Sequence, residues 1–182
     1  MRKHFFIITI IMAFSYCHAQ ELKPHALNGE YYEGQSYTKV YYDSIVPALQ
    51  KFNNAKEWVA TSFGDYQSVL QYEDRETYKI IIKARQPIEK VFDMANNHIY
   101  YEPILNFTLT IDCRDDKFRM KFENMDLDAI RTLIGPITTK SEASFTITEF
   151  AATHGTWRLS LSKGMVSILN SAYNAITKQD DF

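Results

Sequence analysis

The pattern of hydrophobic and polar positions changes its period at Gly64. Before this glycine, apolar residues recur at spacings of three and four over residues 46–63, which predicts an amphipathic helix. After it the period falls to two, so residues 69–72 and 78–85 are predicted to form a β-hairpin around the charged turn Glu73–Glu76. The apolar stripe of the helix comprises Ile45, Leu49, Phe52, Ala55, Val59, Ser62 and Phe63, with Trp58 beside it, and leaves Lys51, Lys56 and Glu57 facing water.

Three further segments have a regular pattern. Residues 37–42 have the composition of a first strand. Residues 106–113 and 117–125 alternate so regularly that they predict a second antiparallel hairpin with one apolar face. After Gly164, apolar residues at positions 165, 168, 169, 172, 173 and 176 predict a closing amphipathic helix.

The intervening segments have weaker patterns. Residues 86–103, which end at a proline, are interpreted as a connection with room for a short helix at 89–95. Residues 127–142 are interpreted as a loop that contains Gly135 and Pro136, and residues 145–150 as either a strand or a helical segment.

The predicted order of elements is strand, helix, hairpin, hairpin, helix, which indicates an α+β fold. A single antiparallel sheet would bury its apolar face beneath the helices and leave the other face open to solvent. The apolar content of 46% supports a packed core rather than a disordered chain. The predicted organisation is a signal peptide at 1–19, a flexible arm at 20–36, a single domain at 37–178 and a tail at 179–182.

The N-terminal residues have the composition of a secretory leader. Arg2 and Lys3 precede a ten-residue apolar core at 5–14, and small residues precede a predicted cleavage between Ala19 and Gln20. The apolar core is too short to cross a bilayer. We therefore expect export, to the periplasm or to an outer-membrane-associated location.

Cleavage of the leader would change the cysteine content and the charge. Cys17 follows the bulky Tyr16, which disfavours a lipoprotein, and its removal would leave Cys113 as the only cysteine, so no internal disulfide is expected. Removal of Arg2 and Lys3 lowers the formal net charge from −2 to −4. This acidity argues against nucleic acid as a partner.

Two surfaces have the chemistry to bind a ligand. Cations on the open sheet face would attract an anionic glycan, a lipid headgroup or an acidic envelope protein, although a solvated strand face that resists edge pairing has the same pattern. The predicted ligand-binding residues on this face are Lys79, Lys83, Arg85, Thr108, Thr110, Arg119 and Lys121. Tyrosines near the first strand would either stack on a sugar or peptide or pack half-buried, namely Tyr31, Tyr32, Tyr37, Tyr41 and Tyr42.

Catalytic patterns are weak. After cleavage three histidines remain, His25, His98 and His154, none at a spacing typical of metal ligands, so no metal and no cofactor is predicted. Cys113 falls on the apolar phase of its strand, where a small buried residue is more usual than a nucleophile paired with His98. The run Ser160–Lys163 fits an S-x-x-K pattern but lacks the partner motifs of that chemistry.

Two runs of residues also have a distinctive order of motifs. They read KEWVATSFGDYQSVLQYEDRETYKIIIKA at 56–84 and NFTLTIDCRDDKFRMKFENM at 106–125. Together they resemble the secreted bacterial family called domain of unknown function 4468, over about residues 37–127. The resemblance implies a TATA-box-binding-protein-like fold and an envelope location, and it implies no activity and no catalytic residues.

We therefore expect an exported, non-catalytic binding or interaction module of the cell envelope, with no transmembrane span once the leader is removed. The alternative is a hydrolase-like envelope enzyme that uses His98 and His154 with an acid such as Asp112, because a general base needs an acid or base partner within hydrogen-bond reach.

Overall fold

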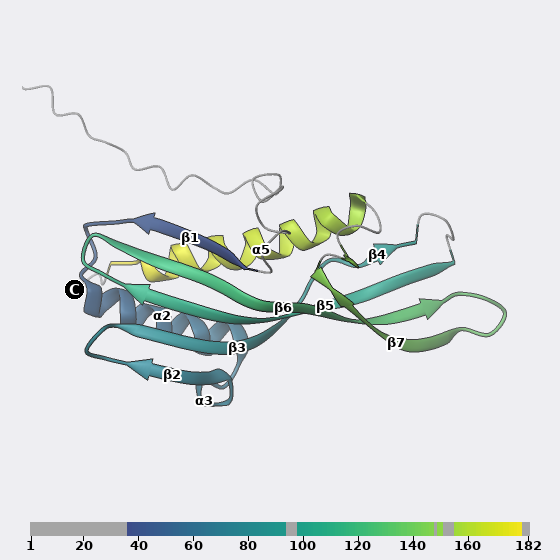
Figure 1. Cartoon of the computed structure of the whole chain (residues 1–182), viewed down its shortest axis with the longest axis horizontal. Helices are drawn as coiled ribbons and strands as arrows, with labels where there is room; N and C mark the ends of the chain where they lie inside the picture. Colours follow the sequence, from purple (N-terminus) through teal and green to yellow (C-terminus); the bar gives the residue numbers. More distant parts are fainter. Residues whose placement is uncertain (1–35, 94–97, 148, 151–154, 180–182) are drawn as a thin grey trace, which may run out of the picture.

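The computed structural model describes residues 36–93, 98–147, 149–150 and 155–179, which form a seven-stranded antiparallel sheet with helices on one of its faces (Figure 1). This confirms the predicted α+β class. The helices are α2 (Ala48–Phe63), α3 (Tyr66–Val69) and α5 (Gly155–Ile176). The strands are β1 (Tyr37–Tyr42), β2 (Leu70–Asp74), β3 (Lys79–Pro87), β4 (Val91–Phe92), β5 (Ile99–Cys113), β6 (Lys117–Leu133) and β7 (Thr139–Thr146).

Two long central strands organise the sheet. β5 and β6 pair along almost their whole length, from Cys113 opposite Phe118 to Ile99 opposite Leu133. Along one half, which we call the proximal half, the strand order is β1-β6-β5-β3-β2. Along the distal half, β7 replaces β1 beside β6 and β4 replaces β3 beside β5. The boundary between the halves lies near Asn106.

A β-bulge in β6 joins the two halves. Asn106 lies opposite Asp126 but Thr108 lies opposite Glu123, so β6 carries one more residue than β5 at this point. Asn124 adopts φ 51°, a left-handed conformation that asparagine tolerates better than most residues. The buried positions of β6 change phase here, from 118, 120 and 122 to 125, 127 and 129, so the same face of the sheet stays buried on both sides.

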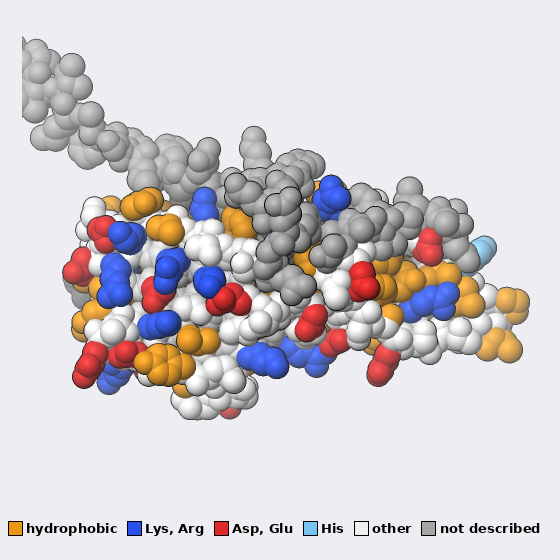
Figure 2. Space-filling model, in the orientation of Figure 1, with side chains coloured by type: hydrophobic (Ala, Val, Ile, Leu, Met, Phe, Trp, Pro, Cys, Tyr) orange, Lys and Arg blue, Asp and Glu red, His pale blue; other side chains and the backbone are white. Residues whose placement is uncertain are grey.

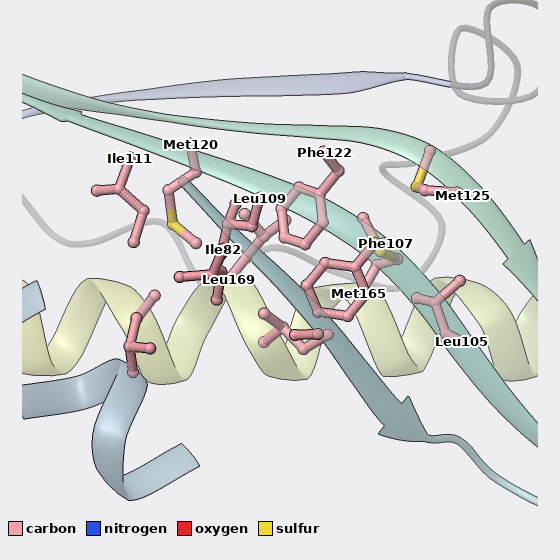
Figure 3. Close-up of a cluster of buried hydrophobic side chains, with 14 of the residues drawn as sticks. Ile82, Leu105, Phe107, Leu109, Ile111, Met120, Phe122, Met125, Met165 and Leu169 are labelled. Atoms are coloured by element: carbon pink, nitrogen blue, oxygen red, sulfur yellow. The ribbon is translucent and has the colours of Figure 1, made fainter. Parts of the chain in front are cut away.

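The core lies between the buried sheet face and helices α2 and α5. Ile80, Leu109 and Met120 are fully buried, as the strand alternation predicts. Figure 3 shows strand side chains such as Leu109 pointing toward α5, where Met165 and Leu169 meet them. Burial of each large apolar side chain contributes about 1.5–3 kcal/mol, so this layer supplies most of the stability.

Helix α2 confirms the predicted helix and the middle of its predicted buried stripe. It begins at Ala48, after Pro47, one turn later than the stripe requires. Ile45 therefore precedes the helix and is 72% exposed, and Leu49 is 47% exposed. The buried side keeps four predicted residues, Phe52, Ala55, Trp58 and Val59, and adds Ala48 and Lys51.

Lys51 is predicted to face water, and this prediction is wrong. Its side chain is fully buried, and the ammonium group donates hydrogen bonds to the backbone carbonyls of Asp43, Arg114 (3.2 Å) and Asp115 (3.0 Å). The apolar stem of the lysine lies along the core while its charged end reaches these carbonyls at the edge. The periodicity of a helix gives no information about hydrogen-bond acceptors that lie in distant segments of the chain.

The prediction of a loop at 127–142 is wrong for most of that segment. β6 continues through it to Leu133 and β7 begins at Thr139. The change of phase at the bulge breaks the alternation that would have extended the predicted strand. Of the segment 145–150, Phe145 and Thr146 complete β7.

The connection predicted at 86–103 is also replaced by strands. β4 forms at Val91–Phe92, where a short helix was an option, and β5 already begins at Ile99. Pro103 lies inside β5, and a proline is normally evidence against a central strand. Its carbonyl accepts a hydrogen bond from the Ile88 backbone N–H at 3.0 Å, so the ladder is kept on that side.

Helix α5 begins at Gly155, well before the predicted start after Gly164. Gly164 lies inside the helix, and a Cβ added there would overlap the side chain of Ile88. The glycine therefore permits close approach of α5 to the chain that follows β3. Among the described residues, no helix combines the length and hydrophobicity that a membrane span requires.

Candidate ligand site on the open sheet face

The sheet face opposite the helices, which we call the open face, carries all the predicted ligand-binding residues. The strand register places Lys79, Lys83 and Arg85 of β3 in rows with residues of β5. The row of Lys79 continues to Arg119 of β6, and Lys121 of β6 lies in the row of Ile81. Thr108 and Thr110 lie between them on β5. Thr110 is only 8% exposed, because Ile81 and Lys121 flank it, and it is therefore not accessible to a ligand.

Most of the predicted cations are neutralised on the face itself. Basic and acidic side chains are interleaved over the sheet (Figure 2). Among the described residues, no ion pair involves Lys79 or Lys83. The other three cations each pair with a carboxylate of the same face, Arg119 with Asp112, Lys121 with Glu123 at 2.6 Å and Arg85 with Asp128 at 3.1 Å. The face attracts anions less strongly than its count of lysines and arginines suggests.

A hollow of about 780 Å³ opens on this face where the bulge joins the proximal and distal halves. This volume lies within the range of small-molecule sites. Ser68 and Gln71 line it on the β2 side, and Ser144 and Thr146 of β7 line it on the other. A second hollow of about 320 Å³ extends from it along the distal half and includes Ile104.

A hydrogen-bonded network crosses the larger hollow. The side-chain amide of Asn106 donates to Asp126 Oδ1 at 2.5 Å and to Asp128 Oδ2 at 3.0 Å, and its oxygen accepts from Arg85 Nε at 3.0 Å. Ser144 Oγ donates to Asp128 Oδ1 at 3.1 Å. The hydrogen bond from Asn106 lowers the pKa of Asp128 below its usual value, and the hydrogen bond from Ser144 and the charge of Arg85 act in the same direction. The polar groups are therefore oriented before any ligand arrives.

The lining of the hollow carries charges of both signs, with one more carboxylate than cations. Two cations, Lys83 and Arg85, and three carboxylates, Asp126, Asp128 and Glu149, contribute to it. Amide and hydroxyl groups supply both donors and acceptors between them. A neutral ligand rich in hydroxyl groups fits this lining better than an anion does.

The strand pattern identifies only part of this site. It correctly places Lys83 and Arg85 on the open face, but it does not identify Asn106, Asp128 or Ser144 as site residues. The register that brings Asp128 and Ser144 together exists only beyond the bulge, in a segment whose pattern is interpreted as a loop. Asn106 was the one detectable signal, because it is a polar residue at an outward position of a predicted strand.

The structure places the candidate catalytic residues far apart. His98 precedes β5 and Cys113 ends it, so this strand of 15 residues separates them by roughly 45 Å. Asp112 lies beside Cys113 and pairs with Arg119, so it cannot serve as the acid for His98. His25 and His154 lie outside the described residues.

Cys113 itself is buried, as its strand phase predicts. Burial raises the pKa of its thiol to about 12, and the charge of nearby Lys51 offsets this only in part. The thiol is therefore protonated at neutral pH, whereas a nucleophilic cysteine needs the thiolate.

The S-x-x-K run serves a structural contact. Ser160 is buried on α5 and its hydroxyl donates to the Glu89 carbonyl at 2.6 Å, while Lys163 pairs with the Glu89 carboxylate at 2.8 Å. Both contacts attach α5 to the chain between β3 and β4. In the part of the chain that the structure describes, no group of three or more histidine, cysteine or acidic residues is arranged to hold a metal ion.

Of the tyrosines of β1, Tyr37 and Tyr41 pack on the helix side of the sheet, whereas Tyr42 is 69% exposed. Tyr41 stacks on Phe118 with ring centroids 4.9 Å apart, and Tyr37 packs against the same core. Burial raises the pKa of Tyr41 above its usual value. The half-buried interpretation therefore holds for these two residues, and Tyr31 and Tyr32 lie outside the described residues.

Comparison with known proteins gives a family and a fold. The model of a domain of unknown function (DUF4468) with TBP-like fold matches residues 37–127. A DUF4468 family protein from Bacteroides ovatus has a TM-score of 0.52 at 10% identity, covering 81% of this chain and 88% of that chain. A TBP-like protein from Parabacteroides distasonis has a TM-score of 0.48 at 13% identity, covering 77% and 93% respectively. No curated protein matches the chain.

Proposed function

The chain belongs to the family of domains of unknown function (DUF4468) with TBP-like fold, and we propose that it is an exported, non-catalytic module of the cell envelope that binds a polar ligand on its open sheet face. The hollow of about 780 Å³ with its network around Asn106 is the observation that supports this proposal. A preorganised set of donors and acceptors lowers the cost of ordering on binding.

The ligand class follows from the lining of the hollow. Hydroxyl groups donate and accept hydrogen bonds, so they suit a wall in which carboxylates, an amide and a guanidinium alternate. We therefore propose a neutral glycan of the envelope as the ligand, rather than the anionic glycan or lipid headgroup expected from five cations.

The binding proposal is tested by titrating the protein purified from envelope with neutral oligosaccharides released from the same envelope. Backbone NMR shifts are expected to move at Asn106, Asp126 and Ser144. The Asn106→Ala variant should weaken binding by about tenfold, because it removes charge-assisted hydrogen bonds that orient the site. Asn53→Ala, at an exposed position on α2, is the matched control and should leave the affinity unchanged.

Two results would reject the binding proposal. One is the absence of saturable binding by any neutral oligosaccharide fraction. The other is a set of shifts confined to the charged rows at Lys79 and Arg119, which would return the site to the anion-binding interpretation.

The export proposal rests on the leader pattern at 1–19, which lies outside the described residues. N-terminal sequencing of the protein from the envelope fraction should begin at Gln20. A protein that begins at Met1 in the cytoplasmic fraction would reject export, and one that begins at a lipid-modified Cys17 would replace soluble export with lipidation.

A further inference from the structure

The distal end of the molecule carries an exposed apolar tip, formed by the turn between β6 and β7. Ile134 and Ile137 are 46% and 80% exposed, and Gly135 and Pro136 lie between them. The turn extends beyond the end of α5, so no helix covers it (Figure 1). Hydrophobic side chains form this end of the surface, with a basic group directly behind them (Figure 2).

The tip is held by strands rather than by a loose loop. β7 pairs with β6 from Thr146 opposite Asp126 to Thr139 opposite Leu133, immediately before the turn. The backbone N–H of Ile134 also donates to the His98 carbonyl at 2.6 Å, which ties the turn to the start of β5. Two isoleucines are thus presented to solvent on a rigid three-stranded support, where their exposure is a persistent cost.

The two charged residues nearest the tip are basic. The first charged residue from the turn along β6 is Arg131, and along β7 it is Lys140, with no acidic residue between them in the sequence. The two residues occupy adjacent rows of the ladder, so they lie on opposite faces of the hairpin. The acids Glu142 and Glu102 lie in the row of Ile130, one row further from the turn than Arg131.

An apolar tip followed along its strands by cations is suited to binding the surface of a bilayer. Apolar side chains enter the boundary between headgroups and acyl chains, and long basic side chains extend back to the lipid phosphates. Because the acids lie further from the turn than both cations, the part of the hairpin that would meet the bilayer is apolar and basic. We propose that the β6–β7 tip inserts shallowly into an anionic phospholipid bilayer, with Ile134 and Ile137 in the interface and Arg131 and Lys140 on the phosphates.

This contact is separate from the glycan site. The hollow lies further back on the same hairpin, so the tip would hold it close to the membrane surface without occupying it. Two isoleucines give weak and reversible binding, since even one acyl chain alone anchors only marginally. A second contact would be needed for permanent attachment.

The test is co-sedimentation with vesicles of phosphatidylethanolamine and phosphatidylglycerol, compared with vesicles of phosphatidylcholine. The protein should bind the anionic vesicles and bind the neutral ones less. The double variant Ile134→Ser, Ile137→Ser should lower the partition coefficient by about tenfold or more, because it removes the apolar surface that enters the bilayer. Arg131→Gln with Lys140→Gln should remove the preference for anionic vesicles.

Ile45→Ser is the matched control. Ile45 is 72% exposed and lies at the opposite end of the molecule, beside the β5–β6 turn, so its replacement should leave vesicle binding unchanged. A tryptophan at 137 should also shift its emission to the blue on vesicle addition, whereas a tryptophan at 45 should not. Thermal unfolding of each variant should match that of the parent, because none of the five substituted side chains is buried in the core.

Three outcomes would overturn the proposal. The first is no sedimentation with vesicles of either composition. The second is equal binding by the parent and the Ile134→Ser, Ile137→Ser variant. The third is concentration-dependent dimerisation of the parent that the same variant abolishes, which would make the tip a contact between copies of the chain.

Discussion

Replacement of Lys51 by methionine should destabilise the protein strongly, although methionine is close to lysine in length and is apolar. Lys51 is fully buried on α2, and its ammonium group donates to carbonyls of the β1–α2 connection and of the β5–β6 turn. Methionine retains the packing of the stem but donates to none of the three oxygens. Methionine also removes the charge that lies 3.9 Å from the Asp43 carboxylate, so the prediction isolates the polar contacts of Lys51 as a whole from its packed volume.

The magnitude follows from these contacts. A hydrogen bond to a charged group contributes about 1.5–3 kcal/mol, and the three bonds share one donor group, so their contributions do not add in full. Breaking a buried charged contact on one side typically costs about 3–5 kcal/mol. Methionine recovers part of this by avoiding burial of a charge. We expect a loss of about 3 kcal/mol in the free energy of unfolding.

The assay is urea unfolding followed by tryptophan fluorescence. With a slope near 2 kcal/mol per molar urea, a loss of about 3 kcal/mol lowers the midpoint by roughly 1.5 M. Lys56→Met is the control, because Lys56 lies on the same helix with a side chain 34% exposed and pairs with Glu73 at 2.7 Å. Its loss should stay below about 1 kcal/mol. Equal midpoints for the two variants would refute the reasoning.

Two further predictions concern buried or hydrogen-bonded groups. Because burial raises the pKa of Cys113 to about 12, its thiol should not react with iodoacetamide at pH 8 in the folded protein and should react fully in urea, and rapid labelling of the folded protein would contradict its burial. Asn106→Ala should raise the pKa of Asp128, as measured by carboxyl NMR titration, because the Asn106 amide is the main cause of its lowered value. A carboxyl whose pKa is lowered in the folded state stabilises the fold at pH values above its ordinary pKa of about 4, and this stabilisation is lost as the pH falls through the folded-state pKa. The difference in unfolding free energy between the parent and Asn106→Ala should therefore shrink below about pH 4. A difference that is constant with pH would show that the ionisation of Asp128 plays no part.

The sequence by itself determined the fold class and the faces of the strongest elements. The period of 3.6 located α2, and the period of two placed Ile80, Leu109 and Met120 in the core. Such patterns are local, because the polarity of each residue indicates only whether its own side chain faces solvent or the core. Lys83 and Arg85 were placed on the open face by the same argument.

The tertiary structure decided which of these faces carries a site. Asn124 inserts a bulge, changes the phase of β6 and so brings Asp128 and Ser144 beside Asn106, which no period could indicate. Lys51 can be buried because backbone carbonyls distant in the sequence accept hydrogen bonds from its ammonium group. Hydrogen bonds and ion pairs of this kind depend on which strands become neighbours, and that is settled by the packing of the whole chain rather than by any one segment.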